Sequence, residues 1–153
     1  MPIALADLLD EKRIALALRA SDQAGAVREL VDLIAGDGAL RAPDQLVDLV
    51  LQREKTNSTF AEDGVAFPHA RTDLVPDITL AIGRSVAGIP WNQDGARAHL
   101  IFLLGVPQKM INDYLVVIGT IARTTKDDAL RTLLLHAENV ADFITTVQAA
   151  PSI

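Results

Sequence analysis

The residues best suited to chemistry stand in the run Gly64–Arg71, which reads GVAFPHAR. The alternation predicts that Val65 and Phe67 lie on one face of a short strand. Pro68 fixes its own φ and favours an extended Phe67, so His69 is expected to leave the strand on a stiff backbone, in a loop that exposes it. An imidazole has an ordinary pKa of about 6.5, which suits proton or group transfer near neutral pH. A surface histidine at a strand end is the alternative, and the run leaves both open.

A second group of polar residues precedes this run. Arg53 and Glu54 stand at the end of an expected helix, and Ser58 and Thr59 follow a few residues later. The order Arg-Glu, Ser-Thr, Gly-Val-Ala-Phe-Pro-His-Ala-Arg resembles the enzyme IIA domains of the fructose/mannitol class of the bacterial phosphoenolpyruvate-dependent sugar phosphotransferase system. That class includes stand-alone nitrogen-regulatory members. The resemblance extends over most of the chain, from Leu5 to about Val147.

The resemblance implies a phosphoryl carrier with His69 as the nucleophile. His69 would accept a phosphoryl group from the histidine phosphocarrier protein. It would then pass the group to the IIB domain of a permease, or hold it as a regulatory signal. Donor and acceptor are proteins, so no metal and no organic cofactor is expected. The alternative is a non-catalytic regulatory module that binds a transporter or a kinase through the same surface.

Phosphoryl transfer needs an unprotonated nucleophilic nitrogen, preorganised hydrogen-bond donors and restricted water. The candidate donors before and after His69 are Arg53, Ser58, Thr59 and Arg71. A guanidinium can bind two phosphoryl oxygens at once, and Arg53 matches the arginine of the family pattern. Each candidate has a structural alternative: a helix-end cation for Arg53, local turn bonds for the hydroxyls, and a solvated surface charge for Arg71.

The chain departs from the family pattern at one position. Family members usually carry a second histidine immediately before a leucine, at the start of the helix after the last strand. The corresponding pair here is Tyr114-Leu115. A phenol, with an ordinary pKa near ~10, cannot share a proton with His69 at neutral pH, but it can donate a hydrogen bond to a phosphoryl oxygen. Covering apolar surface is the alternative role of Tyr114. Because Tyr114 replaces the usual histidine, the hypothesis of a non-catalytic binding module stays open.

The remaining acidic and imidazole side chains near these motifs are expected to be structural. Glu54 is expected to pair with a neighbouring cation, and Glu62 and Asp63 to lie in a turn. His99 opens an apolar strand, and His136 ends a helix where a cation suits the helix dipole. The sequence contains no metal-ligand spacing, no phosphate-binding glycine loop and no Gly-x-Ser-x-Gly motif. Metal, nucleotide and serine-hydrolase sites are therefore not indicated.

The composition fits one compact domain. The chain has 153 residues, of which 50% are hydrophobic and 4% aromatic, so an aliphatic core is expected. The formal net charge of −6 argues against a nucleic-acid partner. The absence of cysteine excludes disulfide and thiolate chemistry. The first residues do not form a signal peptide, and no apolar run approaches the ~20 residues of a membrane span. We therefore expect a cytoplasmic protein without direct membrane insertion.

The apolar periodicity predicts an α/β fold, with a small mixed β-sheet flanked by helices on both faces. One domain is expected over residues 1–153, with a frayed tail at 150–153. The strands are expected at 14–18, 65–67, 78–83, 89–91 and 99–106, and a turn at 92–95. The strand at 99–106 is apolar on both faces and is expected to be central.

Five helices are expected around the sheet. They begin, in order, at Ser21–Asp22, Pro43, Asp113, Thr125 and Asn139. The fourth is expected to open with a capping box made by Thr125 and Asp128. Its buried side chains are expected to be Leu130, Leu133 and Leu134. The resemblance further implies that His69 lies at a sheet edge, under the start of the third helix.

Overall fold

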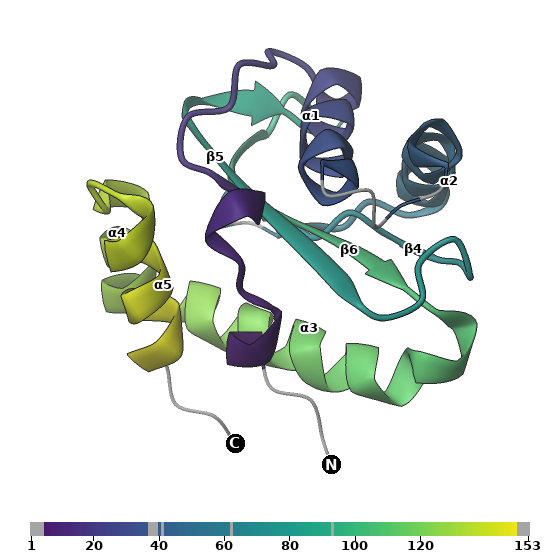
Figure 1. Cartoon of the computed structure of the whole chain (residues 1–153). Coiled ribbons are helices and arrows are strands. Elements are labelled where there is room, and N and C mark those ends of the chain that lie inside the picture. The colour runs from purple at the N-terminus through teal and green to yellow at the C-terminus, as the bar shows by residue number, and fades with distance from the viewer. Residues whose placement is uncertain (1–4, 37–39, 41, 62, 93, 150–153) are drawn as a thin grey trace.

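The computed structural model describes residues 5–36, 40, 42–61, 63–92 and 94–149. The expectations for Glu62, for residue 93 and for the tail at 150–153 lie outside these ranges. With η for a short 3-10 helix, the elements follow in the order η1 (Leu5–Leu8), η2 (Glu11–Arg13), β1 (Ile14–Ala15), α1 (Gln23–Ala35), α2 (Pro43–Thr56), β2 (Phe60–Ala61), β3 (Val65–Ala66), β4 (His69–Arg71), β5 (Thr79–Pro90), β6 (Arg97–Val106), η3 (Gln108–Met110), α3 (Ile111–Lys126), α4 (Asp128–His136) and α5 (Val140–Ala149) (Figure 1).

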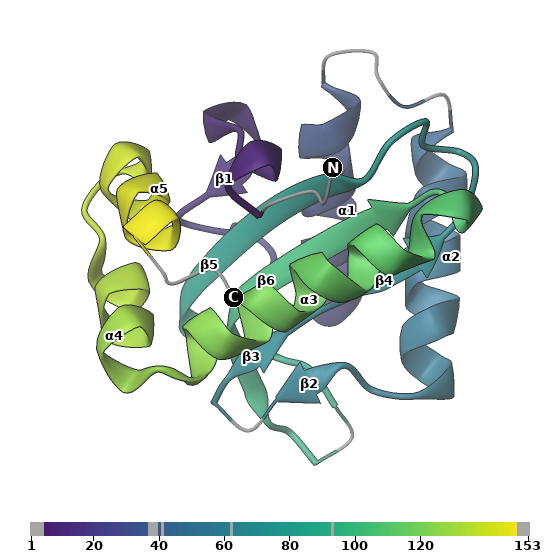
Figure 2. The same ribbon diagram turned by 90° about the horizontal axis from the view of Figure 1, so that it is seen from below.

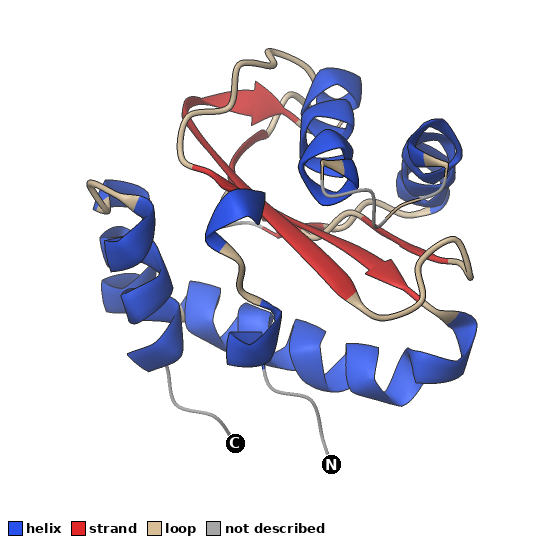
Figure 3. Ribbon diagram, in the orientation of Figure 1, coloured by secondary structure: helices blue, strands red, loops and turns tan. Residues whose placement is uncertain are grey.

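The helices form two layers, one on each face of the sheet. Helices α1 and α2 cover one face, and α3 runs across the other, with α4 and α5 at one end of it (Figures 1 and 3). The predicted α/β fold with helices on both faces is confirmed. No helix within the described ranges is long and apolar enough to cross a bilayer.

Strand β6 contributes to the apolar cores on both faces of the sheet, because its successive side chains point to opposite faces. Leu100, Phe102 and Leu104 belong to the apolar cluster that includes residues of α3 and α5. Ile101 and Leu103 belong to the cluster formed with α1 and α2. All five are essentially buried, and each contributes about 1.5–3 kcal/mol of hydrophobic stabilisation. The prediction of a central strand that is apolar on both faces is confirmed.

The sheet is mixed, as predicted, and its strand order is β1-β5-β6-β3-β2. Strands β5 and β6 pair antiparallel, as do β2 and β3, whereas β1 pairs parallel with β5. Strands β3 and β4 both pair parallel with β6, one after the other along its length. Viewed from below, α3 crosses over β6 and its neighbours (Figure 2).

The first two helices begin where the sequence predicts. Asp22 caps α1, since its Oδ1 accepts a hydrogen bond of 2.7 Å from the Gly25 N–H. Helix α2 starts at Pro43, whose missing N–H is tolerated in the first turn. The buried side of α2 comprises Leu46, Val47, Val50 and Glu54. Helix α2 therefore packs on the sheet and contacts β4.

Three of the predicted strands have the wrong bounds. The strand expected at 14–18 stops at Ala15, and the two expected at 78–83 and 89–91 are one long strand, β5. The pairing register of β5 shifts between Arg84 and Ile89, and Gly88 there has φ +83°. This β-bulge interrupts the alternation, which is why the sequence suggests two strands where the structure has one.

The prediction that His69 leaves the strand in an exposed loop is also wrong. Pro68 separates two short strands, and His69 is the first residue of β4, where it pairs with Leu104 of β6. The Leu104 N–H donates a hydrogen bond of 3.0 Å to the Pro68 carbonyl. The chain therefore resumes its pairing with β6 directly after Pro68. Only 8% of His69 is exposed.

The predicted start of the fourth helix is wrong as well. Helix α3 continues to Lys126, and Thr125 is buried inside it, with its hydroxyl bonded to the Ile121 carbonyl at 2.9 Å. Asp127 caps α4 instead, because its Oδ1 accepts from the Leu130 N–H at 3.0 Å. Of the three leucines predicted to be buried, Leu134 is buried, Leu130 is half-buried and Leu133 is exposed.

Leu134→Ala is expected to lower the free energy of unfolding by about 2–5 kcal/mol, because it leaves a cavity in the core. Leu134 is 0% exposed. Leu133→Ala is the matched control: that side chain is 56% exposed. Its cost is expected to stay near ~0.5 kcal/mol. Urea unfolding followed by circular dichroism measures both. Equal losses in the two variants would contradict this placement of α4.

Candidate functional site

The site is centred on the imidazole of His69 at the edge of the sheet. Its Nδ1 lies 2.9 Å from the Phe67 carbonyl oxygen. A carbonyl only accepts, so Nδ1 carries the proton and donates. The other nitrogen, Nε2, is then unprotonated and has a free electron pair. This tautomer provides the nucleophilic nitrogen that a phosphoryl acceptor requires.

The surroundings keep this ring neutral. Burial is the largest cause, and it lowers the pKa of His69 from the ordinary 6.5. The bond to the Phe67 carbonyl opposes this effect. The charges of Arg53 and Arg71 lower the pKa further, and the charge of Glu54 raises it. The net direction is downward, so the uncharged form dominates at neutral pH.

Tyr114 lies against the same ring, as the resemblance implies. The Tyr114 hydroxyl is 3.4 Å from His69 Nε2, a long hydrogen bond in which the phenol donates. The ring centroids are 5.1 Å apart, with a tilt of 36°. Burial raises the pKa of Tyr114 above its ordinary value of 10, against the opposing charges of Arg53 and Arg71. The phenol therefore keeps its proton and acts only as a donor.

Arg53 and Arg71 reach the pocket that contains His69. This pocket, of ≈ 280 Å³, is lined by Leu49, Arg53, His69, Ala70 and Arg71. Arg53 also donates from Nη1 to the Asn57 carbonyl at 2.8 Å, which is the helix-end role foreseen for it. A guanidinium has five N–H donors, and this bond engages one of them. Arg71 is exposed at the end of β4.

Ser58 and Thr59 face Glu54. The Thr59 hydroxyl donates to Glu54 Oε2 at 2.7 Å, and the Ser58 hydroxyl lies 3.4 Å from Oε1. These bonds differ from the local turn bonds to the backbone that were the structural alternative. Such a bond is present at Ser58, whose Oγ also accepts from the Phe60 N–H at 3.2 Å. The expected ion pair of Glu54 is not formed: among the described residues its hydrogen bonds come from uncharged donors, including the indole of Trp91 at 2.8 Å.

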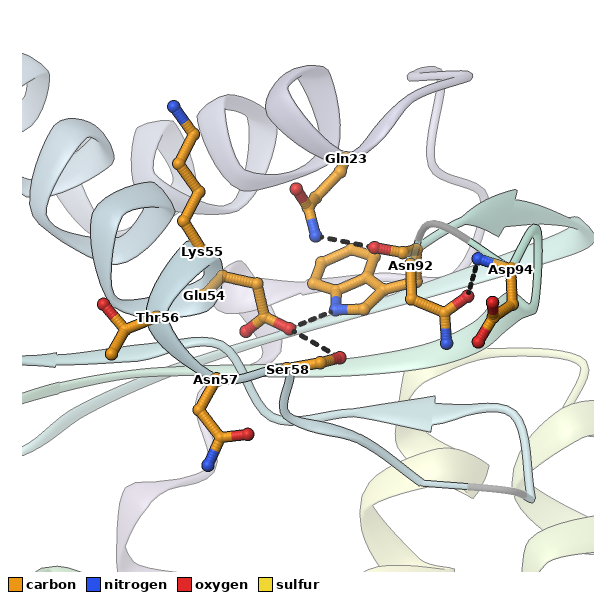
Figure 4. Close-up of a pocket in the computed structure, with 9 residues that line it drawn as sticks. Gln23, Glu54, Lys55, Thr56, Asn57, Ser58, Asn92 and Asp94 are labelled. Carbon is orange, nitrogen blue, oxygen red and sulfur yellow. Dashed lines mark hydrogen bonds between the residues drawn. The ribbon is translucent and has the colours of Figure 1, made fainter.

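A larger pocket, of ≈ 620 Å³, has Glu54 in its lining. Figure 4 shows Glu54 projecting from the end of α2 toward Ser58, with Gln23, Asn92 and Asp94 on the far wall. Trp91 forms part of the lining. No sequence motif pointed to this pocket, because its walls come from three distant segments.

The other histidines are structural, as expected. His99 Nδ1 bonds to the Ser85 carbonyl at 3.0 Å within the β5–β6 ladder, and His136 is the exposed last residue of α4. Asp63 lies in a turn and forms an ion pair of 3.8 Å with Arg131. Across the described part of the chain, no group of three or more His, Cys, Asp or Glu could hold a metal ion.

Two contributors to the site are missed by the motifs. Leu49 stands one helical turn before Arg53, and this i, i+4 spacing is a signal that places both on one face of α2. The acceptor that fixes the imidazole is a backbone carbonyl, that of Phe67, and side-chain patterns do not mark it.

Comparisons with known proteins agree with this geometry. The family model described as "Phosphoenolpyruvate-dependent sugar phosphotransferase system, EIIA 2" matches residues 7–150. The fructose-specific EIIA component of Haloferax volcanii is 34% identical over 116 residues, 75% of this chain and 75% of that protein. The nitrogen regulatory protein of Bradyrhizobium diazoefficiens is 30% identical over 154 residues, 99% of this chain and 97% of that protein. The chain thus belongs to the EIIA 2 family of this phosphotransferase system.

Other relatives are much longer. The fructose-specific EIIABC component of Bacillus subtilis is 28% identical over 136 residues, and the matched part is 88% of this chain but 21% of that protein. Among solved structures, the nitrogen regulatory protein IIA-Ntr of Neisseria meningitidis has a TM-score of 0.85 at 24% identity, covering 94% of this chain and 98% of that one. The IIA subunit in a complex of enzyme IIAMTL and phosphorylated enzyme IIBMTL from Escherichia coli has a TM-score of 0.79 at 19% identity, with coverage of 92% and 96%. These likenesses support the fold.

Titration of His69 by 15N NMR is expected to show a midpoint below ~6.5, the ordinary value, and an Nδ1–H tautomer at neutral pH. The same ring in urea-denatured chain is the reference. Because the folded-state pKa is lowered, the unfolded chain binds more protons between the folded and the unfolded pKa. The contribution of His69 to stability is therefore complete above the unfolded pKa and is lost as pH falls from there through the folded pKa. A midpoint above that of the denatured chain would contradict the buried, neutral ring.

Proposed function

We propose that this protein is a phosphoryl carrier that accepts a phosphoryl group on Nε2 of His69. The donor is the histidine phosphocarrier protein. The acceptor is a IIB partner, or the group stays on His69 as a regulatory signal. One observation supports this above the others: the Phe67 carbonyl holds the Nδ1 proton, and the free Nε2 belongs to a ring that lines a pocket with two arginines.

The transfer follows from this tautomer. The electron pair of His69 Nε2 forms a bond to phosphorus while the N–P bond to the donor imidazole breaks, and the donor nitrogen keeps that electron pair. The ring of His69 gains positive charge as the new bond forms. Its Nδ1–H already points at the Phe67 carbonyl, so this charge is stabilised without rearrangement.

The charge on the phosphoryl oxygens is met by the side chains around the pocket. Arg53 and Arg71 supply positive charge, and their guanidinium groups suit two-point binding of oxygens. The Tyr114 hydroxyl donates toward Nε2 in the resting site, so it can transfer its hydrogen bond to a phosphoryl oxygen. Ser58 and Thr59 support the site through Glu54, and a direct bond to the phosphoryl group would require them to turn away from it.

The partner surface follows from the position of the pocket. Leu49 on α2 and Leu115 on α3 are exposed large apolar side chains on the two helices that carry Arg53 and Tyr114. A protein partner would bury this apolar surface and exclude water during transfer. The relative from Escherichia coli forms a complex with a phosphorylated IIB enzyme, as its description states. The proposal extends such a partner to this chain, takes residues 1–153 as one carrier domain and places it in the cytoplasm.

The non-catalytic module remains the second candidate, because Tyr114 stands where an imidazole is usual. Incubation with phosphoenolpyruvate, enzyme I and the histidine phosphocarrier protein, followed by mass spectrometry of the intact chain, separates the two. We expect one acid-labile phosphate adduct that His69→Ala abolishes. An unmodified native chain would leave only the binding module.

Arg53→Gln is expected to slow phosphorylation of His69 by about a hundredfold, because it removes a preorganised donor from the developing charge. The matched control is Arg123→Gln, which removes an exposed arginine from α3 that does not line the pocket. Quenched-flow sampling with the phosphorylated carrier as donor measures the rate. Equal rates in the two variants would remove Arg53 from the mechanism.

A further inference from the structure

We infer that Glu54 and Thr59 are positioning residues for His69, linked to it through the backbone of Phe67. This inference rests on the proposed function of His69 and adds how the reactive tautomer is selected. Four groups are connected in series: the Glu54 carboxylate, the Thr59 hydroxyl, the Phe67 peptide groups and the His69 imidazole. None of the connecting groups touches the reacting nitrogen.

The series begins at a buried carboxylate. Glu54 is 7% exposed, and a buried carboxylate is stable only when it is fully hydrogen-bonded. It accepts from Trp91 Nε1 at 2.8 Å, the Thr59 N–H at 2.8 Å and the Thr59 hydroxyl at 2.7 Å. These three bonds, with the longer one from Ser58, fix the orientation of the carboxylate. Figure 4 shows the bond to Ser58.

Thr59 transmits this orientation to the strand of the site. A threonine hydroxyl has one proton, and Thr59 donates it to Glu54. The lone pairs of the same oxygen therefore face the opposite direction, where the Phe67 N–H donates at 3.2 Å. The Glu54 carboxylate thus fixes the orientation of the Thr59 hydroxyl, and the hydroxyl oxygen in turn holds the Phe67 N–H.

Phe67 passes the constraint to the imidazole. Its N–H is held by Thr59, and its carbonyl belongs to the rigid peptide bond that precedes Pro68. The direction of this carbonyl is consequently fixed, and it accepts the Nδ1 proton of His69 at 2.9 Å. Either ring nitrogen of a neutral histidine can carry the proton, so this acceptor is what leaves Nε2 free.

The series is also connected to Trp91. This residue directly follows β5, lines the larger pocket and is the only tryptophan in the sequence. Its indole N–H is bonded to the same carboxylate oxygen that accepts from the Thr59 N–H. Trp91 emission is therefore a built-in signal for a change in this series.

Thr59→Val tests the inference, because valine keeps the shape and removes the hydroxyl. The population of the Nε2–H tautomer of His69, read by 15N NMR, is expected to rise. The phosphorylation rate is expected to fall by about tenfold to a hundredfold, since the attacking atom is no longer held in place. Thr59→Ser is expected to restore both, and Glu54→Gln to disturb both.

The matched control is Thr56→Val, three residues earlier. The Thr56 hydroxyl bonds only locally, to the Gln52 carbonyl at 3.2 Å, among the bonds that the structure describes. It is exposed at the end of α2, so the tautomer and the rate should match the native protein. Thermal unfolding of every variant separates a general loss of stability from a specific effect on His69.

Trp91 gives a second readout. Phosphorylation of the native protein is expected to change its emission, and the change is expected to vanish in Thr59→Val. A native tautomer and a native rate in folded Thr59→Val would overturn the inference. A native chain that takes up no phosphoryl group would refute the proposed function instead, and the tautomer measurement on unphosphorylated protein would still decide the role of Thr59.

Discussion

The hydrogen bond from His69 Nδ1 to the Phe67 carbonyl is the interaction on which the site depends. It determines which nitrogen is free, and it requires a backbone that cannot turn. Pro68 provides one part of that rigidity, because its ring fixes φ between the two residues. The parallel pairing of His69 with Leu104 provides the other, because it ties β4 to the most buried strand of the sheet.

Burial and charge act in the same direction on this imidazole. A ring that is 8% exposed is kept neutral by desolvation, and the two nearby arginines disfavour its protonation. Under the proposed function the same arginines would attract the phosphoryl oxygens. A chain with a net charge of −6 thus has a locally positive pocket around a neutral base. Burial is the larger cause of that neutrality, and the two arginines add to it. Under the proposed function the same arginines would also bind the group.

The sequence predicts the parts of the site whose signals are local. His69 follows a proline, and Arg53 lies in the last turn of a helix, so local pattern marks both, and both match the family pattern. Tyr114 is singled out only by the resemblance. The sequence does not predict the partners of Glu54, because Trp91 comes 37 residues later and approaches only once the sheet has formed. It also misplaces His69 in a loop, since a strand of three residues, β4, has too little pattern to be seen.

The phenol of Tyr114 changes the chemistry that a second imidazole would offer. An imidazole can take or give a proton near neutral pH, whereas burial raises the pKa of Tyr114 and its proton stays in place. The site then contains one base, His69, and otherwise only donors: Tyr114 and the two arginines. A donor set without a second base stabilises the phosphoryl oxygens but cannot activate a water molecule for hydrolysis. Under the proposed function, a phenol in place of an imidazole would therefore favour retention of the phosphoryl group on His69 until a partner takes it.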